Sequence, residues 1–267
     1  MKIISDYHMH TKLCGHADGE PAQYVERALA LGLTEIGFSD HAPLVSHRDP
    51  GITMDHSELP QYHQMIENIR AQYKGKIKIR TGIEADFLPG FETQTQALLG
   101  SYPYDYVIGS IHFIKRWGFD DPIQRQEWDN KDIDEVYREY YELLRQSAAS
   151  GLFDVMGHVD VVKKFGHKPS QPMIDDVKRT AQTFKKAGVA IELNTSGLRK
   201  PVKEMYPSLW SLEIYAAAGV PLTFGSDAHK PEEVGADFDQ ARDLALKAGY
   251  KKYVIFQNRK IFKQNSL

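Results

Sequence analysis

Short apolar runs alternate with longer amphipathic patterns along the whole chain. Each run is rich in β-branched and aromatic residues, and the pattern that follows repeats apolar positions every three to four residues, as Val25, Ala28 and Leu29 do. Glycine ends several of these patterns, which is typical of a helix C-terminus. We therefore expect seven strand–helix units, with strands at 2–10, 35–41, 77–86, 104–112, 153–160, 189–197 and 220–229 and helices at 21–32, 58–75, 91–100, 132–151, 171–188, 206–219 and 238–249. An eighth apolar run, 250–257, has no helix after it.

Strands that are separated by helices predict a parallel sheet with right-handed crossovers. Such a chain can form an open doubly wound sheet or a closed barrel. The polar residues favour the barrel, because each of the seven predicted strands ends in side chains suited to metals or catalysis. In a barrel the C-terminal ends of all strands surround one mouth, whereas an open sheet gathers only a few at its switch point. We predict a closed or nearly closed α/β ring.

The composition is that of an ordinary globular protein, and it excludes several classes. Apolar residues make up 42% of the chain, which is enough for a core, but no apolar run approaches the length of a membrane span. The net charge of −3 argues against a nucleic acid polymer as partner. Cys14 is the single cysteine, so no intrachain disulfide can form. Because no signal-peptide pattern is apparent, we expect a cytoplasmic protein without a membrane partner.

Histidines gather at the predicted strand ends. His8 and His10 stand two residues apart on a strand, so their side chains point to one face and can reach one metal ion. Asp227 and His229 repeat this spacing near the other end of the chain. A lone pair of this kind more often marks a polar strand end. However, seven of the eleven histidines lie at or just after a strand end, and that joint arrangement predicts a metal centre.

Seven motifs follow one another along the chain: DYHMHTKLCGH, FSDHAPL, GIEADF, YVIGSIHF, GHVDVVKKFG, NTSGLRKP and GSDAHKPEEVG. In this order they resemble the motifs of the PHP (polymerase and histidinol phosphatase) family of metal-dependent phosphoesterases, over essentially the whole chain. The resemblance implies a single PHP-type domain over residues 1–267. It also implies a distorted (β/α)7 TIM-like barrel with three divalent transition-metal ions, Zn, Fe or Mn, at the C-terminal ends of the strands.

Carried over position by position, the resemblance assigns side chains to each ion. It gives His8, His10, Glu84 and Asp227 to the first ion, Glu84, His112 and His158 to the second, and His16, His41 and His229 to the third. Cys14 lies close to His16 in the sequence, but the resemblance supplies His16 for the ligand role.

Neighbouring cations lower the pKa of a bridging water and neutralise phosphate oxygens, so we expect hydroxide to attack the phosphorus of a phosphomonoester. Phosphate oxygens that the metals leave free need cationic partners. Arg199 suits bidentate phosphate contact, and Lys200, Lys163 and Lys164 are further candidates for substrate binding.

The leaving alkoxide needs a proton. Asp160 lies two residues beyond His158 and shares its face if the strand continues, which makes it a candidate general acid. His41 is the alternative donor.

The resemblance implies that the substrate is L-histidinol phosphate, a small-molecule ester of histidine biosynthesis. Its ammonium and imidazole groups want acidic or aromatic neighbours, and the loop after His112 offers Trp117, Asp120 and Asp121. One alternative is a PHP-type phosphoesterase that acts on nucleotides or another small phosphomonoester. Others are an amidohydrolase-type barrel, which usually wants a bridging lysine, and a metal-binding protein without catalysis. The oligomeric state stays open.

Overall fold

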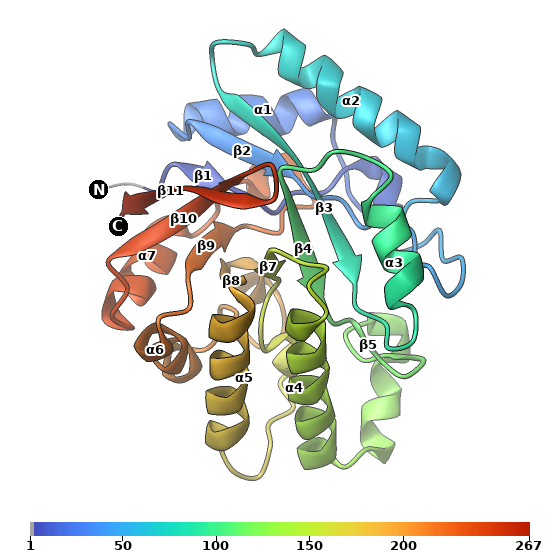
Figure 1. The fold of residues 1–267 in the computed structure, drawn as a ribbon, viewed down its shortest axis with the longest axis vertical. Helices are drawn as coiled ribbons and strands as arrows, with labels where there is room; N and C mark the ends of the chain where they lie inside the picture. The colour runs from blue at the N-terminus through green and yellow to red at the C-terminus, as the bar shows by residue number, and fades with distance from the viewer. Residues whose placement is uncertain (1–2) are drawn as a thin grey trace.

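The computed structural model describes residues 3–267, which are arranged around seven parallel strands (Figure 1). In ring order the strands are β1 (Ser5–Asp6), β2 (Glu35–Phe38), β3 (Lys78–Asp86), β4 (Tyr106–Ser110), β7 (Val155–Met156), β8 (Ala190–Asn194) and β9 (Leu222–Gly225). Backbone contacts join β9 to β1: Tyr7 N donates to Phe224 O at 3.2 Å, and Met9 and Ala228 form a parallel bridge. The ring is nearly closed, and the predicted (β/α)7 barrel is confirmed.

Each strand of the ring leads to an α-helix on its outer side (Figure 1). The helices are α1 (Pro21–Ala30), α2 (Leu59–Gln72), α3 (Glu92–Leu99), α4 (Ile133–Ala149), α5 (Ile174–Ala187), α6 (Leu209–Ala218) and α7 (Phe238–Lys247). All seven lie where the apolar pattern predicts them. Gly188 and Gly219 follow α5 and α6 with φ of 76° and 71°, a left-handed backbone that glycine adopts at little cost. Within residues 3–267 no helix is both long and apolar enough to cross a membrane.

Shorter elements connect or cover the ring. The 3₁₀ helices are η1 (Lys12–Cys14), η2 (His56–Glu58), η3 (Pro122–Asn130), η4 (Val161–Lys163), η5 (Ser196–Arg199) and η6 (Pro231–Glu233). One small hairpin joins β5 (Phe113–Ile114) to β6 (Trp117–Gly118), and another joins β10 (Lys252–Gln257) to β11 (Lys260–Ser266). The eighth apolar run therefore pairs with β11 and stays outside the ring.

The β10–β11 hairpin closes the N-terminal end of the barrel. Phe256 N donates to the Tyr7 hydroxyl at 3.2 Å, and Arg259 N donates to Asp105 O, just before β4, at 2.8 Å. Inside the ring, the Tyr7 and Tyr106 rings stack with centroids 4.8 Å apart. Aromatic side chains thus fill this end of the barrel and leave the C-terminal mouth for polar chemistry.

Several strands are shorter than predicted. β1 spans two residues instead of 2–10, and β7 spans two instead of 153–160. After β7 and β9 the backbone turns as it leaves the ring, since His158 and Asp227 have φ of 21° and 52°. Several of the predicted ligands therefore lie in loops immediately beyond the strands.

Candidate metal centre

All nine predicted ligands lie together at the C-terminal mouth of the barrel. They follow six of the seven strands of the ring: His8, His10 and His16 after β1, His41 after β2, Glu84 within β3, His112 after β4, His158 after β7, and Asp227 and His229 after β9. Their ring contacts and ion pairs connect them into three adjoining groups.

The first group contains His8, His10, Glu84 and Asp227. Glu84 Oε2 lies 3.1 Å from His8 Nε2 and 3.6 Å from His10 Nε2. Asp227 Oδ1 lies 3.9 Å and 3.2 Å from the same two nitrogens. Met9, between the two histidines, is fully buried in the hydrophobic core. The two histidines thus share one face, as their spacing predicts.

The second group contains Glu84, His112 and His158. His158 Nε2 lies 2.9 Å from Glu84 Oε1 and 3.3 Å from His112 Nε2. His112 Nε2 lies 3.7 Å from the same carboxylate oxygen. Glu84 therefore turns one oxygen to each of the first two groups, which is the arrangement that a bridging ligand needs.

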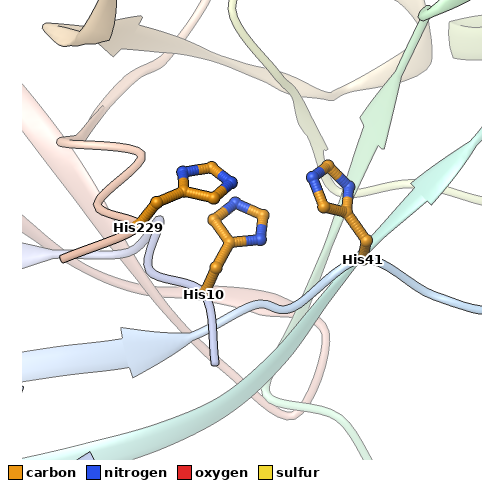
Figure 2. Close-up of side chains that lie close together, drawn as sticks. All are labelled: His10, His41 and His229. Atoms are coloured by element: carbon orange, nitrogen blue, oxygen red, sulfur yellow. The ribbon is translucent and has the colours of Figure 1, made fainter. Parts of the chain in front are cut away.

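The third group contains His16, His41 and His229. The ring of His16 lies 4.7 Å from that of His229 and 5.4 Å from that of His41. His10 also reaches this group, with its ring 4.0 Å from His229 and 4.3 Å from His41. Figure 2 shows the rings of His10, His41 and His229 gathered around a common space from three separate segments. His10 thus adjoins both the first and the third group.

The donor atoms in these groups fit divalent metal ions. Several of them are buried without a hydrogen-bond partner among residues 3–267: His8 Nε2, His10 Nε2, Glu84 Oε2, His158 Nδ1 and His229 Nε2. Buried polar atoms are normally paired, so a set of facing orphans indicates a ligand. The sets of three donor atoms that lie within 4.8 Å of one another include His8–His10–Asp227, His8–Glu84–His158 and His10–His41–His229. Imidazole with carboxylate suits Zn, Fe or Mn.

Three further carboxylates stand behind ligand histidines. Each faces an Nδ1 atom: Glu192 Oε1 at 2.7 Å from His8, Asp40 Oδ1 at 3.4 Å from His10, and Asp86 Oδ1 at 3.0 Å from His112. Such partners orient the ring and direct its Nε2 toward the metal. We did not predict Glu192, although a glutamate inside the apolar run of β8 was a usable signal, because charged residues are rarely buried unless paired.

The charges of the site suit metal binding. Burial opposes ionisation of Glu84, but the charges of His41 and His8 hold the pKa of this carboxyl well below its usual range. Burial likewise opposes ionisation of Asp227, and His8 lowers its pKa in the same way. Burial, together with the charge of His41, lowers the pKa of His10 to about 3. Anionic carboxylates and neutral imidazoles are the forms that ligate metals. Burial opposes protonation of His8, His41 and His112, but nearby carboxylates outweigh it and raise their pKa values, so these rings release protons when a metal binds.

Known proteins share this architecture. A sequence model of the PHP domain matches residues 6–196. The chain belongs to the PHP domain family. A probable histidinol-phosphatase of Deinococcus radiodurans is 40% identical over 98% of this chain and 99% of its own length. The histidinol-phosphatase of Bacillus subtilis is 32% identical over 88% of this chain and 96% of its own.

A solved structure gives the same picture of the PHP fold. It is the histidinol phosphate phosphatase of Lactococcus lactis subsp. lactis in complex with zinc, L-histidinol and phosphate. The two chains are 26% identical, and the match covers 97% of this chain and 98% of the Lactococcus chain with a TM-score of 0.82. The predicted family membership is confirmed.

Asp160 does not share a face with His158 in this PHP domain. The prediction depended on a strand that continues past His158, and it is wrong because β7 ends at Met156 and Asp160 adopts φ 77°. Asp160 Oδ2 accepts hydrogen bonds from Ser208 N at 2.9 Å and Ser208 Oγ at 3.1 Å, and it lies 3.2 Å from Lys163 Nζ. Asp160 thus joins η4 to the segment before α6.

Lys163 belongs to the same internal network. Its Nζ donates to Met205 O at 2.8 Å, Ser208 Oγ at 2.6 Å and Glu204 Oε2 at 3.0 Å, and its side chain is only 7% exposed. An ammonium has three donors, so these acceptors leave none for a phosphate. Lys163, a predicted substrate contact, is therefore taken up by this network. Its neighbour Lys164, the other candidate in the same motif, differs: its Nζ has Asp120 as its one acceptor within residues 3–267, at 2.9 Å.

Arg199 lies beside the Asp227 loop. Its Nη2 donates to Ser226 O at 2.6 Å and to Asp227 O at 3.3 Å, and its Nε lies 3.3 Å from Glu233 Oε1. Its Nη1 is buried and has no partner among residues 3–267. Lys200 follows η5 and is partly exposed, with no side-chain ion pair in that range.

Cys14 lies beside the third ligand group. Its sulfur is within 4.8 Å of donor atoms of both His16 and His229. The thiol is buried, and this burial, with the nearby charge of Asp40, raises its pKa. A thiol that stays protonated is a poor ligand, so His16 remains the better donor.

Proposed function

We propose that this protein is a metal-dependent phosphomonoesterase that hydrolyses L-histidinol phosphate to L-histidinol and phosphate, a reaction of histidine biosynthesis. The observation that carries the proposal is the convergence of nine imidazole and carboxylate ligands on one mouth of the barrel. The substrate is supported by the full-length relatives that bear the name histidinol-phosphatase. A structural neighbour that holds zinc, L-histidinol and phosphate supports it further.

The nine side chains hold three divalent ions, Zn, Fe or Mn, in the three groups described above. When bound, such ions supply an activated water at neutral pH and neutralise charge on the phosphate oxygens. Glu84 positions the first two groups relative to each other because each of its oxygens faces one of them. Glu192 holds His8 from behind, so that the Nε2 of this histidine stays directed into the mouth.

Arg199 binds a phosphate oxygen through its free Nη1. The other arm of the guanidinium is already anchored to the backbone carbonyls of Ser226 and Asp227, so the free nitrogen is held in place. A fixed guanidinium donor loses little entropy when it contacts phosphate. Lys200, which is partly exposed beside it, adds positive charge at the rim.

His41 is one of the two predicted proton donors for the leaving alkoxide. As a ligand of the third group that also contacts Glu84, its imidazole has no free proton to give. Its side chain is 14% exposed and its Nδ1 lies 3.0 Å from Glu84 Oε2, inside the cluster. Asp160 is the other predicted donor. Its Oδ2 accepts from Ser208 N and Oγ, and its Oδ1 is buried without a hydrogen-bond partner among residues 3–267.

Phosphate release from purified, metal-loaded protein tests the proposal. We expect turnover of L-histidinol phosphate with a kcat/KM well above that for adenosine monophosphate, and loss of turnover in Glu84→Gln. A higher kcat/KM for the nucleotide would identify the alternative PHP-type phosphoesterase. Metal bound without turnover of either ester would identify a metal-binding protein without catalysis.

A further inference from the structure

Two charged side chains hold the segment that carries Asp227 and His229. Arg199 Nη2 donates to Ser226 O at 2.6 Å and to Asp227 O at 3.3 Å. Glu233 Oε2 accepts from His229 N at 2.9 Å. Neither Arg199 nor Glu233 is among the nine predicted ligands, so both act on the backbone that carries two of them.

Glu233 also pairs with Arg199. Its Oε1 lies 3.3 Å from Arg199 Nε, whereas its Oε2 is bound to His229 N. One carboxylate thus connects the guanidinium to the segment of a predicted metal ligand. Both side chains of the pair are 23% exposed. A partly exposed ion pair adds little to the stability of a fold, so its main effect is on the groups that it orients.

The pair restrains the guanidinium of Arg199 and leaves one nitrogen over. Nε and Nη2 lie on one edge of this planar group, and Glu233 and two backbone carbonyls hold these two nitrogens. With the plane restrained in this way, the direction of Nη1 is set as well. Nη1 is buried and has no partner among residues 3–267. A buried donor is normally paired, so this one indicates a ligand.

The charge of Glu233 has two opposite effects on a phosphate at Arg199 Nη1. It holds the guanidinium in one orientation, which favours the contact, and it repels the phosphate, which opposes the contact. Glu233 lies on the Nε side of the group, so its attraction to the cation acts over 3.3 Å and its repulsion of the phosphate acts over a longer path. Coulomb energies fall with distance and with screening, so we expect the favourable effect to exceed the repulsion.

We infer that Glu233 is a positioning residue, which directs Arg199 Nη1 toward the phosphate of the substrate and keeps it in a fixed relation to the segment of Asp227 and His229. The inference rests on the part of the proposed function that makes Arg199 the phosphate contact. A guanidinium that is oriented in advance loses less entropy on binding than a free one. Loss of the Glu233 carboxylate should therefore weaken phosphate binding, and it should do so through Arg199.

Calorimetric titration of the metal-loaded protein with inorganic phosphate tests the inference without turnover. In Glu233→Gln the amide oxygen can still accept from His229 N, whereas the charge beside Arg199 Nε is lost. We expect the Kd for phosphate to rise about 10-fold, as for a lost contact to a charged group, while metal content stays at that of the wild type. Glu232→Gln is the matched control and should bind phosphate as the wild type does, because Glu232 is exposed in the same 3₁₀ helix and has no side-chain partner among residues 3–267.

A double-mutant cycle with Arg199→Ala shows whether Glu233 acts through Arg199. Arg199→Ala should weaken phosphate binding, and Glu233→Gln added to it should cause no further loss. A similar loss from Glu233→Gln with and without Arg199 would overturn the inference. So would an unchanged or lower phosphate Kd in Glu233→Gln, loss of metal from that variant, or an unchanged Kd in Arg199→Ala.

An assay of the wild type with L-histidinol phosphate separates the inference from the proposed function. Protein that binds phosphate but does not hydrolyse this ester would overturn the proposed function, and the cycle would still decide the role of Glu233. Protein that hydrolyses the ester but shows no coupling between Glu233 and Arg199 would overturn the inference alone.

Discussion

His8 Nδ1 lies 2.7 Å from Glu192 Oε1, and both side chains are almost fully buried. The same carboxylate, through Oε2, accepts from the backbone N–H of His158 at 2.8 Å. One buried glutamate in the middle of β8 thus positions two ligand-bearing segments, those that follow β1 and β7. β8 contributes to the centre through this support, although none of the nine ligands comes from it.

Glu192→Gln is expected to weaken metal binding about 10- to 100-fold, since an amide orients the His8 ring less firmly and does not raise its basicity. Titration with Zn²⁺ and a competing chelator measures the affinity. Glu213→Gln, on the exposed side of α6, is the matched control and should bind as the wild type does. Equal affinities in all three proteins would show that Glu192 has no part in holding the ligand.

Gly225→Ala is expected to disrupt the same contact sterically. A Cβ at this position would lie 1.8 Å from Glu192 Oε1 and 2.6 Å from His8 Cβ. We expect reduced metal content and a loss of about 1–3 kcal/mol in the free energy of unfolding, as for overpacked cores. Gly51→Ala, whose nearest neighbour would be 3.5 Å away, is the control. Full metal content and unchanged stability in Gly225→Ala would contradict this packing.

Much of the fold follows from pattern alone, because helix and strand periodicities differ and a βα alternation permits few topologies. The nine ligands could also be predicted from the sequence, since a barrel brings the C-terminal ends of its strands together wherever they fall along the chain. Strand alternation predicts Asp160 on the same face as His158, but the strand ends at Met156 and the backbone turns before Asp160. Lys163 and Lys164 are adjacent in sequence. Only the structure shows that Lys163 has several acceptors, whereas Lys164 has Asp120 as its one acceptor among residues 3–267.

Asp160→Asn is expected to leave turnover close to that of the wild type, whereas loss of a true general acid lowers it about 10²- to 10⁴-fold. The substitution should instead change how the stability of the fold depends on pH. The pKa of Asp160 is raised from 3.8 to about 6, chiefly because the carboxyl is buried. A raised pKa means that the folded chain holds the proton more tightly, so this stabilisation is present below about pH 4 and is lost as pH rises through 6.

Thermal unfolding of the wild type and Asp160→Asn near pH 4 and near pH 7, at matched metal content, measures this dependence. Asparagine does not titrate, so the variant has no such stabilisation to lose. The unfolding temperature of the variant minus that of the wild type should therefore be higher near pH 7 than near pH 4. A relative unfolding temperature that falls over this range, or a large loss of turnover, would contradict the structural role.

His16→Ala tests the third ligand group separately. His16 reaches the cluster from the loop after β1 and contacts only the His41 and His229 side of it. We expect metal content to fall by about one ion per chain while the other two groups stay loaded, since each keeps its own donor set. His56→Ala, in the exposed η2 segment, is the control. Loss of all metal from His16→Ala would show that the groups do not fill independently.

A multinuclear metal centre that hydrolyses L-histidinol phosphate should be detectable by elemental analysis of the purified protein, paired with a phosphate-release assay on the same sample. We expect about three ions of Zn, Fe or Mn per chain in protein that turns over L-histidinol phosphate, as multinuclear phosphate chemistry requires. Fully active protein with fewer than two ions per chain would contradict it.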